Sequence, residues 1–269
     1  MIGFDYLGKA GQLGNQMFQF AATKGIAQNR GYDMCIPDHK EKVNDGIGNI
    51  LRIELDDVFD IDCQRCMMSR GPGQTPSPTM EESFHFDETL FNNCPDNVSL
   101  YGFFQSEKYF KNIEDTIRRD FIFKKKIRDE CKEIVDEVFD QDPIALHIRR
   151  GDFLINSGNH HNLSLDWYEK ALKKFDPDRE VILFSDDIFW ASAQELFKPD
   201  RFIISDSSSY HDLFMMTQCS DFIIANSTFS WWGAWLANTG RVIAPSKWFG
   251  PNNSHLNTKD LYPSHWEIL

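Results

Sequence analysis

The stretch PIALHIRRGD, residues 143–152, decides the fold of this 269-residue chain. Residues 143–148 form a continuous apolar run, which is typical of a strand buried in a parallel sheet. Two arginines, a glycine and an aspartate follow directly. Because ligands of open α/β sheets bind outside the carboxyl ends of the strands, this junction is also the first place to expect a site.

Around this stretch, short apolar runs alternate with helical patterns. The helix predicted over 165–175 has Ser164 as its N-cap. Such alternation is the signature of an α/β protein with a doubly wound parallel sheet. The remaining elements predicted here are strands over 180–184, 201–204, 221–225 and, as the last strand, 241–244, and helices over 188–197, 212–219 and 229–238.

The N-terminal half shows a second, weaker βα pattern. We therefore predict two α/β domains, residues 1–135 and 136–269, with a cleft between them. A long surface loop is expected over residues 63–82, which are rich in glycine and proline. The other predicted elements are strands over 1–7, 32–36 and 98–104 and helices over 16–29, 107–120 and 125–139.

Charge and cysteine content limit the partners and the compartment. The net charge of −13 argues against a nucleic-acid partner, because an acidic surface repels nucleic acid, so local basic clusters are informative. Cys63 and Cys66 form a C-x-x-C pair with no second pair or histidine pair at zinc spacing. We expect reduced thiols, and hence a cytoplasmic protein, with a disulfide or metal clip as the alternative. No apolar run is long enough to span a bilayer, and no signal peptide is recognisable.

Arg149 and Arg150 are the strongest candidates for an anion site. Adjacent arginines at a strand end point in different directions, so one can face a ligand while the other braces the loop, and arginine matches phosphate oxygens bidentately. The alternative is that both pair with nearby carboxylates on the surface.

Ser185, Asp186 and Asp187 follow the next predicted strand. Carboxylates there can accept hydrogen bonds from ribose hydroxyls or from a guanine edge. Alternatively, Asp187 only caps the next helix.

Asn226, Ser227, Thr228 and Ser230 lead into the predicted helix 229–238. A helix N-terminus is a natural phosphate site, although an ordinary N-cap explains the same residues. Trp231 is counted with these residues as donor-binding, although Trp231, Trp232 and Trp235 on one short helix fit core packing better than a sugar platform. Near the start of the chain, Gly14, Asn15 and Gln16 lie in a glycine-bearing segment. We place this segment near the donor or acceptor, because glycine lets the backbone approach a ligand closely. No Walker A or G-x-S-x-G motif occurs.

Four segments together resemble the α-1,2-fucosyltransferases, glycosyltransferase family 11. They occur in the family's order, and they are LGNQMFQ at 13–19, HIRRGD at 147–152, FSDDIFW at 184–190 and NSTFSWWGAW at 226–235. The last is highly specific, whereas the H-x-R-R-x-D element is shared with α-1,6-fucosyltransferases and rhizobial enzymes.

The resemblance implies a GT-B-like fold, with two Rossmann-like domains facing across a cleft. It assigns acceptor binding to the N-terminal domain and nucleotide-sugar binding to the C-terminal one. It further implies transfer of fucose from GDP-β-L-fucose to the 2-hydroxyl of a galactoside, with inversion and without a metal or other cofactor. The chain is short for such an enzyme, which leaves the acceptor open.

The resemblance and the residues together predict roles in this reaction. Arg149 stabilises the leaving GDP, and Arg150 supports the pyrophosphate or braces the loop. His147 and Asp186 or Asp187 contact guanosine. Asp152 is the candidate base, although an ion pair with an arginine would weaken it. His160 and His161 fit an exposed loop pair better than an acceptor contact.

Two other functions stay open at this point. One is a different GDP-sugar transferase, such as an α-1,6-type fucosyltransferase, and the other is a non-catalytic carbohydrate-binding module. The partners we expect are a nucleotide sugar and a glycan acceptor. A cytoplasmic enzyme of glycan or surface-polysaccharide synthesis fits best, with peripheral membrane contact and the oligomeric state left open.

Overall fold

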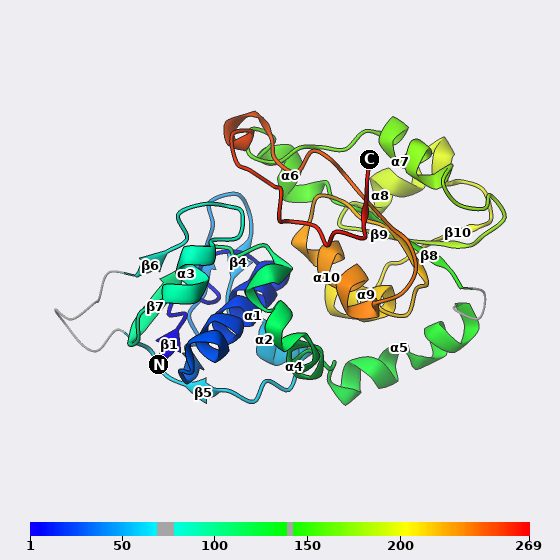
Figure 1. The fold of residues 1–269 in the computed structure, drawn as a ribbon. Helices are drawn as coiled ribbons and strands as arrows, with labels where there is room; N and C mark the ends of the chain where they lie inside the picture. The colour runs from blue at the N-terminus through cyan, green and yellow to red at the C-terminus, as the bar shows by residue number, and fades with distance from the viewer. Residues whose placement is uncertain (69–77, 139–141) are drawn as a thin grey trace. The chain divides into compact units, whose positions relative to one another are not determined.

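A computed structural model describes residues 1–68, 78–138 and 142–269 (Figure 1). The chain forms two compact units: Met1–Ile122 with Leu256–Pro263, and Phe123–His255 with Ser264–Leu269. The boundary predicted at 135/136 falls inside helix α5 (Lys125–Val138), and the units divide ahead of this helix instead. The C-terminal residues also contribute to both units.

The second unit is built on a parallel six-stranded sheet in the order β10-β9-β8-β11-β12-β13. Taken along the chain, this is the 3-2-1-4-5-6 order of the doubly wound dinucleotide-binding fold. The prediction that 241–244 is the last strand is wrong, because β13 at the C-terminus adds a sixth. The strands are β8 (Ile144–Ile148), β9 (Val181–Ser185), β10 (Phe202–Ile204), β11 (Asp221–Ile223), β12 (Val242–Ala244) and β13 (Glu267–Ile268).

The helices of this unit follow the predicted alternation. Ser164 caps its helix as predicted, because its hydroxyl accepts a hydrogen bond from the Trp167 N–H at 3.3 Å. Helix α6, directly after β8, was not predicted. Besides α5, the helices are α6 (Gly151–Ile155), α7 (Leu165–Leu172), α8 (Ile188–Ser192), α9 (Ser209–Met216) and α10 (Thr228–Ala237), with 3-10 turns η3 (Glu195–Phe197) and η4 (Pro251–Asn253).

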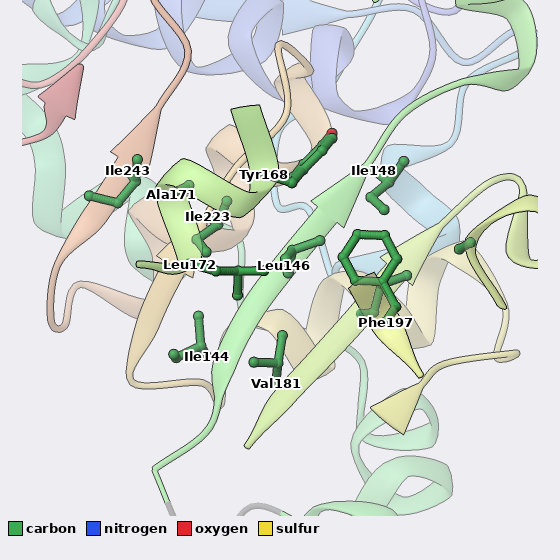
Figure 2. Close-up of a cluster of buried hydrophobic side chains, with 12 residues drawn as sticks. Ile144, Leu146, Ile148, Tyr168, Ala171, Leu172, Val181, Phe197, Ile223 and Ile243 are labelled. Atoms are coloured by element: carbon green, nitrogen blue, oxygen red, sulfur yellow. The ribbon is translucent and has the colours of Figure 1, made fainter. Parts of the chain in front are cut away.

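One face of this sheet carries an apolar core (Figure 2). Ile144, Leu146 and Ile148 project from the same side of β8, as alternation along a strand requires. Tyr168 and Leu172 of α7 pack against them. The intervening residue His147 therefore points to the opposite face, where its ring contacts the first turn of α10.

The first unit holds a parallel five-stranded sheet in the order β5-β2-β1-β7-β6 and a separate β3–β4 pair. The strands are β1 (Ile2–Gly3), β2 (Met34–Ile36), β3 (Val43–Asn44), β4 (Ile50–Leu51), β5 (Gln64–Arg65), β6 (Thr79–Met80) and β7 (Val98–Tyr101). The helices are α1 (Leu13–Arg30), α2 (Leu55–Val58), α3 (Glu88–Asn93) and α4 (Glu114–Asp120), with 3-10 turns η1 (Glu107–Tyr109) and η2 (Lys111–Ile113).

Helix α1 is the central element of this unit and buries most of its length. It starts earlier than predicted, at Leu13, and ends where Gly31 adopts the left-handed conformation with φ +69°. Its Phe20 side chain packs in a cluster of rings in which the centroids of Phe59 and Phe121 are 4.9 Å apart. The single helix predicted over 107–120 is instead two 3-10 turns and the short helix α4.

The loop predicted over 63–82 is wrong at both ends, because β5 and β6 lie inside it. Residues 69–77 of that prediction lie outside the described residues. Short strands of two residues carry too little apolar alternation to stand out from a loop.

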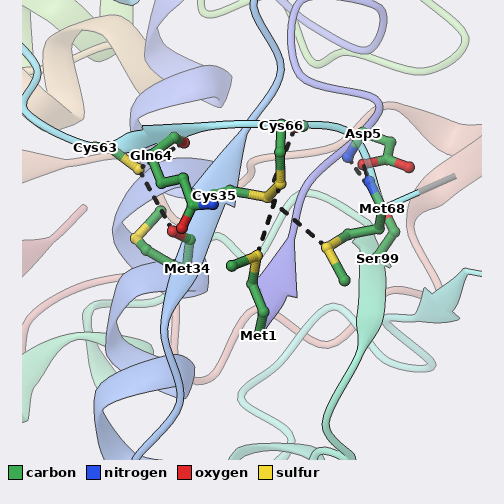
Figure 3. The surroundings of a disulfide bond; sticks show 9 residues. All are labelled: Met1, Asp5, Met34, Cys35, Cys63, Gln64, Cys66, Met68 and Ser99. Atoms are coloured by element: carbon green, nitrogen blue, oxygen red, sulfur yellow. Dashed lines mark hydrogen bonds between the residues drawn. A yellow bond between two sulfur atoms is a disulfide. The ribbon is translucent and has the colours of Figure 1, made fainter. Parts of the chain in front are cut away.

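Cys35 and Cys66 form a disulfide, which corrects the prediction of reduced thiols (Figure 3). The methionine sulfurs of Met1 and Met68 each lie 3.7 Å from one of the bridged sulfurs. Cys63, the other half of the C-x-x-C pair, keeps a free thiol. The disulfide joins β2 to the segment after β5. The prediction of a cytoplasmic location rested on reduced cysteines, and the disulfide removes that basis.

Candidate functional site

The carboxyl ends of β8 and β11 form the switch point of the second sheet. These strands are neighbours, and the chain leaves β8 toward β9 on one side while β11 leads to β12 on the other. In doubly wound sheets the crevice at this point is the ligand site. The structure therefore places the segments that start at Arg149 and at Asn226 where a ligand is expected.

Arg149 is held between two carboxylates. Its guanidinium lies 2.8 Å from Asp152 Oδ1 and 3.2 Å from Asp186 Oδ2. The ring of Phe153 lies 5.6 Å from the same guanidinium. Arg149 thus pairs with carboxylates, but in a largely buried position and not on the surface as the alternative has it. These contacts fix the direction of the charged group, and anion binding by Arg149 stays a prediction. Asp152 has a positioning contact here, and its role as a base stays a prediction.

Arg150 braces the loop, in agreement with one of its two predicted roles. Its Nε donates to Asp187 Oδ2 at 3.1 Å, and its guanidinium stacks 3.8 Å from the Trp190 ring centroid. Its backbone N–H donates to Asp186 Oδ1 at 2.8 Å. A cation held by both a carboxylate and an aromatic face is strongly oriented.

The Ser185–Asp187 segment supplies the partners of these arginines. Asp187 caps α8 as predicted, accepting from the Trp190 N–H at 3.1 Å, and Ser185 Oγ accepts from the Asp187 N–H at 3.0 Å. Gly151 lets this segment approach, because a Cβ there would lie only 2.8 Å from Asp186 Oδ2. The two strand ends therefore interlock, and contact of these carboxylates with guanosine stays a prediction.

His147 is buried and uncharged. Its Nδ1 lies 2.9 Å from Ser230 Oγ on α10, and Tyr168 Oη donates to its backbone carbonyl at 3.2 Å. Burial, together with the nearby charge of Arg149, lowers the pKa of His147 to about 3. The structure thus gives His147 a bracing role, and its contact with guanosine stays a prediction.

Helix α10 presents its N-terminus at this edge. Ser227 caps it, accepting from the Phe229 N–H at 3.4 Å, and Thr228 is its first residue. The first turn of a helix leaves backbone N–H groups without intrahelical partners and carries partial positive charge. The N-terminus of α10 is therefore suited to bind an anion, and the binding of phosphate there stays a prediction.

Asn226 holds the surrounding loops. Its Nδ2 donates to the backbone carbonyls of His161 and Trp248, each at 2.8 Å. His160 stacks on Phe153 with ring centroids 4.0 Å apart, and burial lowers the pKa of both histidines. His160 and His161 are thus half-buried, so the prediction of an exposed loop pair is wrong.

Trp231 belongs to the core and not to a ligand surface. Its ring is fully buried and packs on Trp232 at 5.0 Å and on Trp266 at 5.4 Å between centroids. The inclusion of Trp231 among donor-binding residues is therefore wrong, and the core interpretation is confirmed.

The segment with Gly14, Asn15 and Gln16 belongs to the first unit, at the start of α1. Gln16 is buried, its Nε2 donates to Arg52 O at 2.8 Å, and its Oε1 accepts from the Glu54 N–H at 2.8 Å. Gly14 is also buried. Asn15 Oδ1 accepts from Gln105 Nε2 at 2.9 Å. Gln16 thus serves the fold, and a ligand contact of this segment stays a prediction.

Sequence reasoning missed two aromatic residues of the site, Phe153 and Trp190. Phe153 directly follows the motif HIRRGD and Trp190 ends the motif FSDDIFW, and this position was the available signal. Their rings orient Arg149 and Arg150 respectively. Within residues 1–68, 78–138 and 142–269 there is no group of three or more His, Cys, Asp or Glu side chains that could hold a metal ion.

Comparison with known proteins gives the family context. The pattern of glycosyl transferase family 11 matches residues 80–269. The chain is 35% identical over 195 residues to the O-antigen biosynthesis glycosyltransferase WbnK of Escherichia coli. The match covers 64% of this chain and 64% of WbnK, so it spans less than two thirds of that relative. It is 29% identical to an α-1,2-colitosyltransferase of E. coli over 96% of each chain. The human galactoside α-(1,2)-fucosyltransferase 1 is 21% identical over 86% of this chain and 65% of its own length.

Solved structures confirm the α/β, GT-B-like fold. Fucosyltransferase NodZ from Bradyrhizobium matches 85% of this chain and 90% of its own with a TM-score of 0.52 and 14% identity. POFUT1 in complex with GDP matches 88% of this chain and 94% of its own with a TM-score of 0.54 and 14% identity. Since the family pattern covers well over half of the sequence, this chain belongs to glycosyl transferase family 11.

Proposed function

We propose that the chain transfers L-fucose from GDP-β-L-fucose to the 2-hydroxyl of a galactoside, with inversion and without a metal ion. Membership of glycosyl transferase family 11 supports glycosyl transfer. The α-1,2 linkage is supported by the names of two relatives, a colitosyltransferase and a galactoside fucosyltransferase.

The observation that carries the proposal is the fixed guanidinium of Arg149 at the switch point. In the reaction, the acceptor oxygen forms a bond to C1 of the sugar, and the bond from C1 to the diphosphate oxygen breaks. GDP leaves with the electron pair, and the acceptor hydroxyl gives its proton to Asp152, the candidate base, or to water. Negative charge therefore grows on the diphosphate in the transition state, where a pre-oriented cation and a helix N-terminus stabilise it.

The neighbouring groups have supporting tasks in this proposal. Asp152 and Asp186 hold the Arg149 guanidinium in place before the ligand arrives, so little reorganisation is needed when charge develops. His147 and Ser230 keep the start of α10 against the end of β8. Asp186 and Asp187 remain the residues that we assign to guanosine, through their capacity to accept hydrogen bonds.

A second donor is favoured by a specific observation. The α-1,2-colitosyltransferase matches the chain over nearly its full length. Colitose is L-fucose without the 3-hydroxyl, so a pocket that hydrogen-bonds that hydroxyl would reject it, and an apolar pocket would not.

A donor panel tests the proposed function. The full chain is incubated with lactose and GDP-fucose, GDP-colitose, GDP-mannose or UDP-galactose, with and without EDTA, and released nucleotide is measured. We expect the largest kcat/KM with GDP-fucose, an α-1,2 product by linkage analysis, and no loss with EDTA. Preference for GDP-colitose would select the second donor. An α-1,6 product, or no release from any GDP-sugar, would contradict the proposal.

Among the residues that the structure describes, no helix is both long and apolar enough to cross a membrane. Peripheral contact at the inner face of a membrane and a cytoplasmic location remain part of the proposal. Fractionation of cells that express the full chain, before and after a high-salt wash, tests both.

A further inference from the structure

Four sulfur atoms gather at the disulfide of the first unit (Figure 3). Met68 Sδ lies 3.7 Å from Cys35 Sγ, and Met1 Sδ lies 3.7 Å from Cys66 Sγ, so each bridged sulfur contacts one thioether. The Met1 carbonyl accepts from the Asn97 N–H at 2.9 Å, which fixes the backbone there. The four sulfur-bearing side chains come from three places in the chain: ahead of β1, inside β2 and after β5. The fold therefore collects sulfur at one point from separate segments.

A glycine in β1 makes room for one of the thioethers. A Cβ at Gly3 would lie 2.4 Å from Met68 Cγ and 3.5 Å from Cys35 Sγ, so a larger residue there would displace the Met68 side chain. The Met68 N–H donates to Asp5 Oδ1 at 2.8 Å. Asp5 is buried, and its own N–H donates to Ser99 Oγ of β7 at 3.0 Å. These contacts hold the Met68 thioether beside Cys35.

Opening the bridge turns this cluster into a set of soft ligands. A dithiol reductant supplies two electrons and two protons, the S–S bond breaks, and two thiols form while the reductant closes to a disulfide. Two cysteine sulfurs with two thioethers suit Cu(I), whereas zinc takes cysteine, histidine and carboxylate ligands. Metal–sulfur bonds of about 2.3 Å place the corners of a tetrahedron about 3.8 Å apart, which is close to the 3.7 Å between each thioether and its cysteine.

Cys63, the other half of the C-x-x-C pair, stands apart from this cluster. Its Sγ lies 4.0 Å from Met34 O and 3.5 Å from Gln64 O, and Figure 3 shows it directed at Met34. Burial raises the pKa of the Cys63 thiol, and a protonated thiol is a poor ligand because metals bind the thiolate. The cysteines that can share a metal are therefore Cys35 and Cys66, and not the pair in the sequence motif.

We propose that Cys35, Cys66, Met1 and Met68 bind one Cu(I) ion when the disulfide is reduced. The ion displaces the two thiol protons to water, and two thiolates and two thioethers then coordinate it. In the oxidised chain the bridged sulfurs carry no thiolate, so the redox state of this cysteine pair decides whether the metal binds. The site is separate from glycosyl transfer and does not depend on it.

Competition for Cu(I) with bathocuproine disulfonate under nitrogen tests the site. The full chain, reduced with a dithiol and then freed of it, should bind one Cu(I) ion. The oxidised chain, whose other four thiols are free, should not withdraw Cu(I) from the chelator. Met68→Leu keeps apolar bulk and should weaken binding about tenfold or more. Met67→Leu, at an exposed neighbour, and Cys63→Ser are the matched controls and should bind as the natural chain does.

X-ray absorption at the copper edge gives a readout that binding by stray thiols does not produce. We expect four sulfur neighbours at about 2.3 Å in the natural chain and three in Met68→Leu. Two sulfur neighbours in both proteins, with equal affinity, would show that the methionines only pack on the disulfide. Failure of the reduced chain to bind Cu(I), or equal binding by the oxidised chain, would also overturn the proposal.

Discussion

His147 Nδ1 lies 2.9 Å from Ser230 Oγ, and this buried contact joins the end of β8 to the first turn of α10. Arg149 is two residues beyond His147, and Ser227 is the cap of the same helix. This hydrogen bond between neutral groups holds the helix start against the end of the strand that leads to Arg149, whose guanidinium is oriented by Asp152 and Asp186. A neutral brace of this kind adds no charge to the site that it supports.

The brace is tested by a double-mutant cycle. Ser230→Ala should lower the free energy of unfolding by about 1–3 kcal/mol, because it leaves a buried imidazole nitrogen unpaired. His147→Leu with Ser230→Ala should cost less than the sum of the singles, with a coupling of about 0.5–3 kcal/mol. Urea denaturation of the four proteins measures this, and the exposed Ser209→Ala is the control. Strict additivity would show that the contact contributes nothing.

Burial of a neutral histidine also sets a pH dependence. The pKa of His147 is about 3 in the folded protein and near 6.5 in the unfolded chain, so only the unfolded chain takes up this proton between those values. Stability from His147 is therefore complete above pH 6.5. Each pH unit below 6.5 should remove up to about 1.4 kcal/mol.

The contribution of His147 to the pH dependence of stability is measured as a difference between two proteins, because other groups also titrate in this range. Burial raises the pKa of Glu81 and of Asp212 to about 7, and such carboxyls stabilise the fold as the pH falls. We therefore compare unfolding of the natural chain and of His147→Leu from pH 7 to pH 5, with exposed His255→Gln as control. The gap between the natural chain and His147→Leu should narrow as the pH falls. A constant gap would mean that His147 does not carry the effect.

The disulfide gives a prediction about thiols. All six cysteines lie in described parts of the chain, and four of them are free. Under denaturing, non-reducing conditions a thiol reagent should therefore titrate four groups, and Cys66→Ser should lower stability by about 2–4 kcal/mol. Cys63→Ser, three residues away, is the matched control and should change little. Titration of all six thiols in protein purified without reductant would contradict the bridge.

The repeating part of the fold could be predicted from sequence, and its irregular parts could not. β8 and α7 were found because apolar runs and helical periodicity extend over several residues there. β13 was missed because two residues at the end of a chain show no periodicity, and their pairing with β12 is a tertiary contact. The Cys35–Cys66 bridge was missed because pairing is not encoded by spacing.

The sequence indicated which residues form the candidate site, but not how their side chains contact one another. The rule that ligands bind at the carboxyl ends of strands selected the ends of β8, β9 and β11, and the structure brings the ends of β8 and β9 into contact. The rule could not show that Arg149 lies between Asp152 and Asp186, because that depends on how the loops fold back. The hydrophobic residue Trp231 was ambiguous on a helix that is apolar on every side, and only burial resolved it.

The role of Arg149 is tested most directly by the kcat/KM for GDP-fucose and the affinity for GDP of Arg149→Ala. Arg241→Ala, which removes an arginine ahead of β12 at the opposite end of the sheet, is the matched control. The account predicts that Arg149→Ala loses about a hundredfold or more in kcat/KM and binds GDP more weakly, while Arg241→Ala stays near the natural value. An Arg149→Ala enzyme that keeps its kcat/KM within about twofold would contradict the central claim.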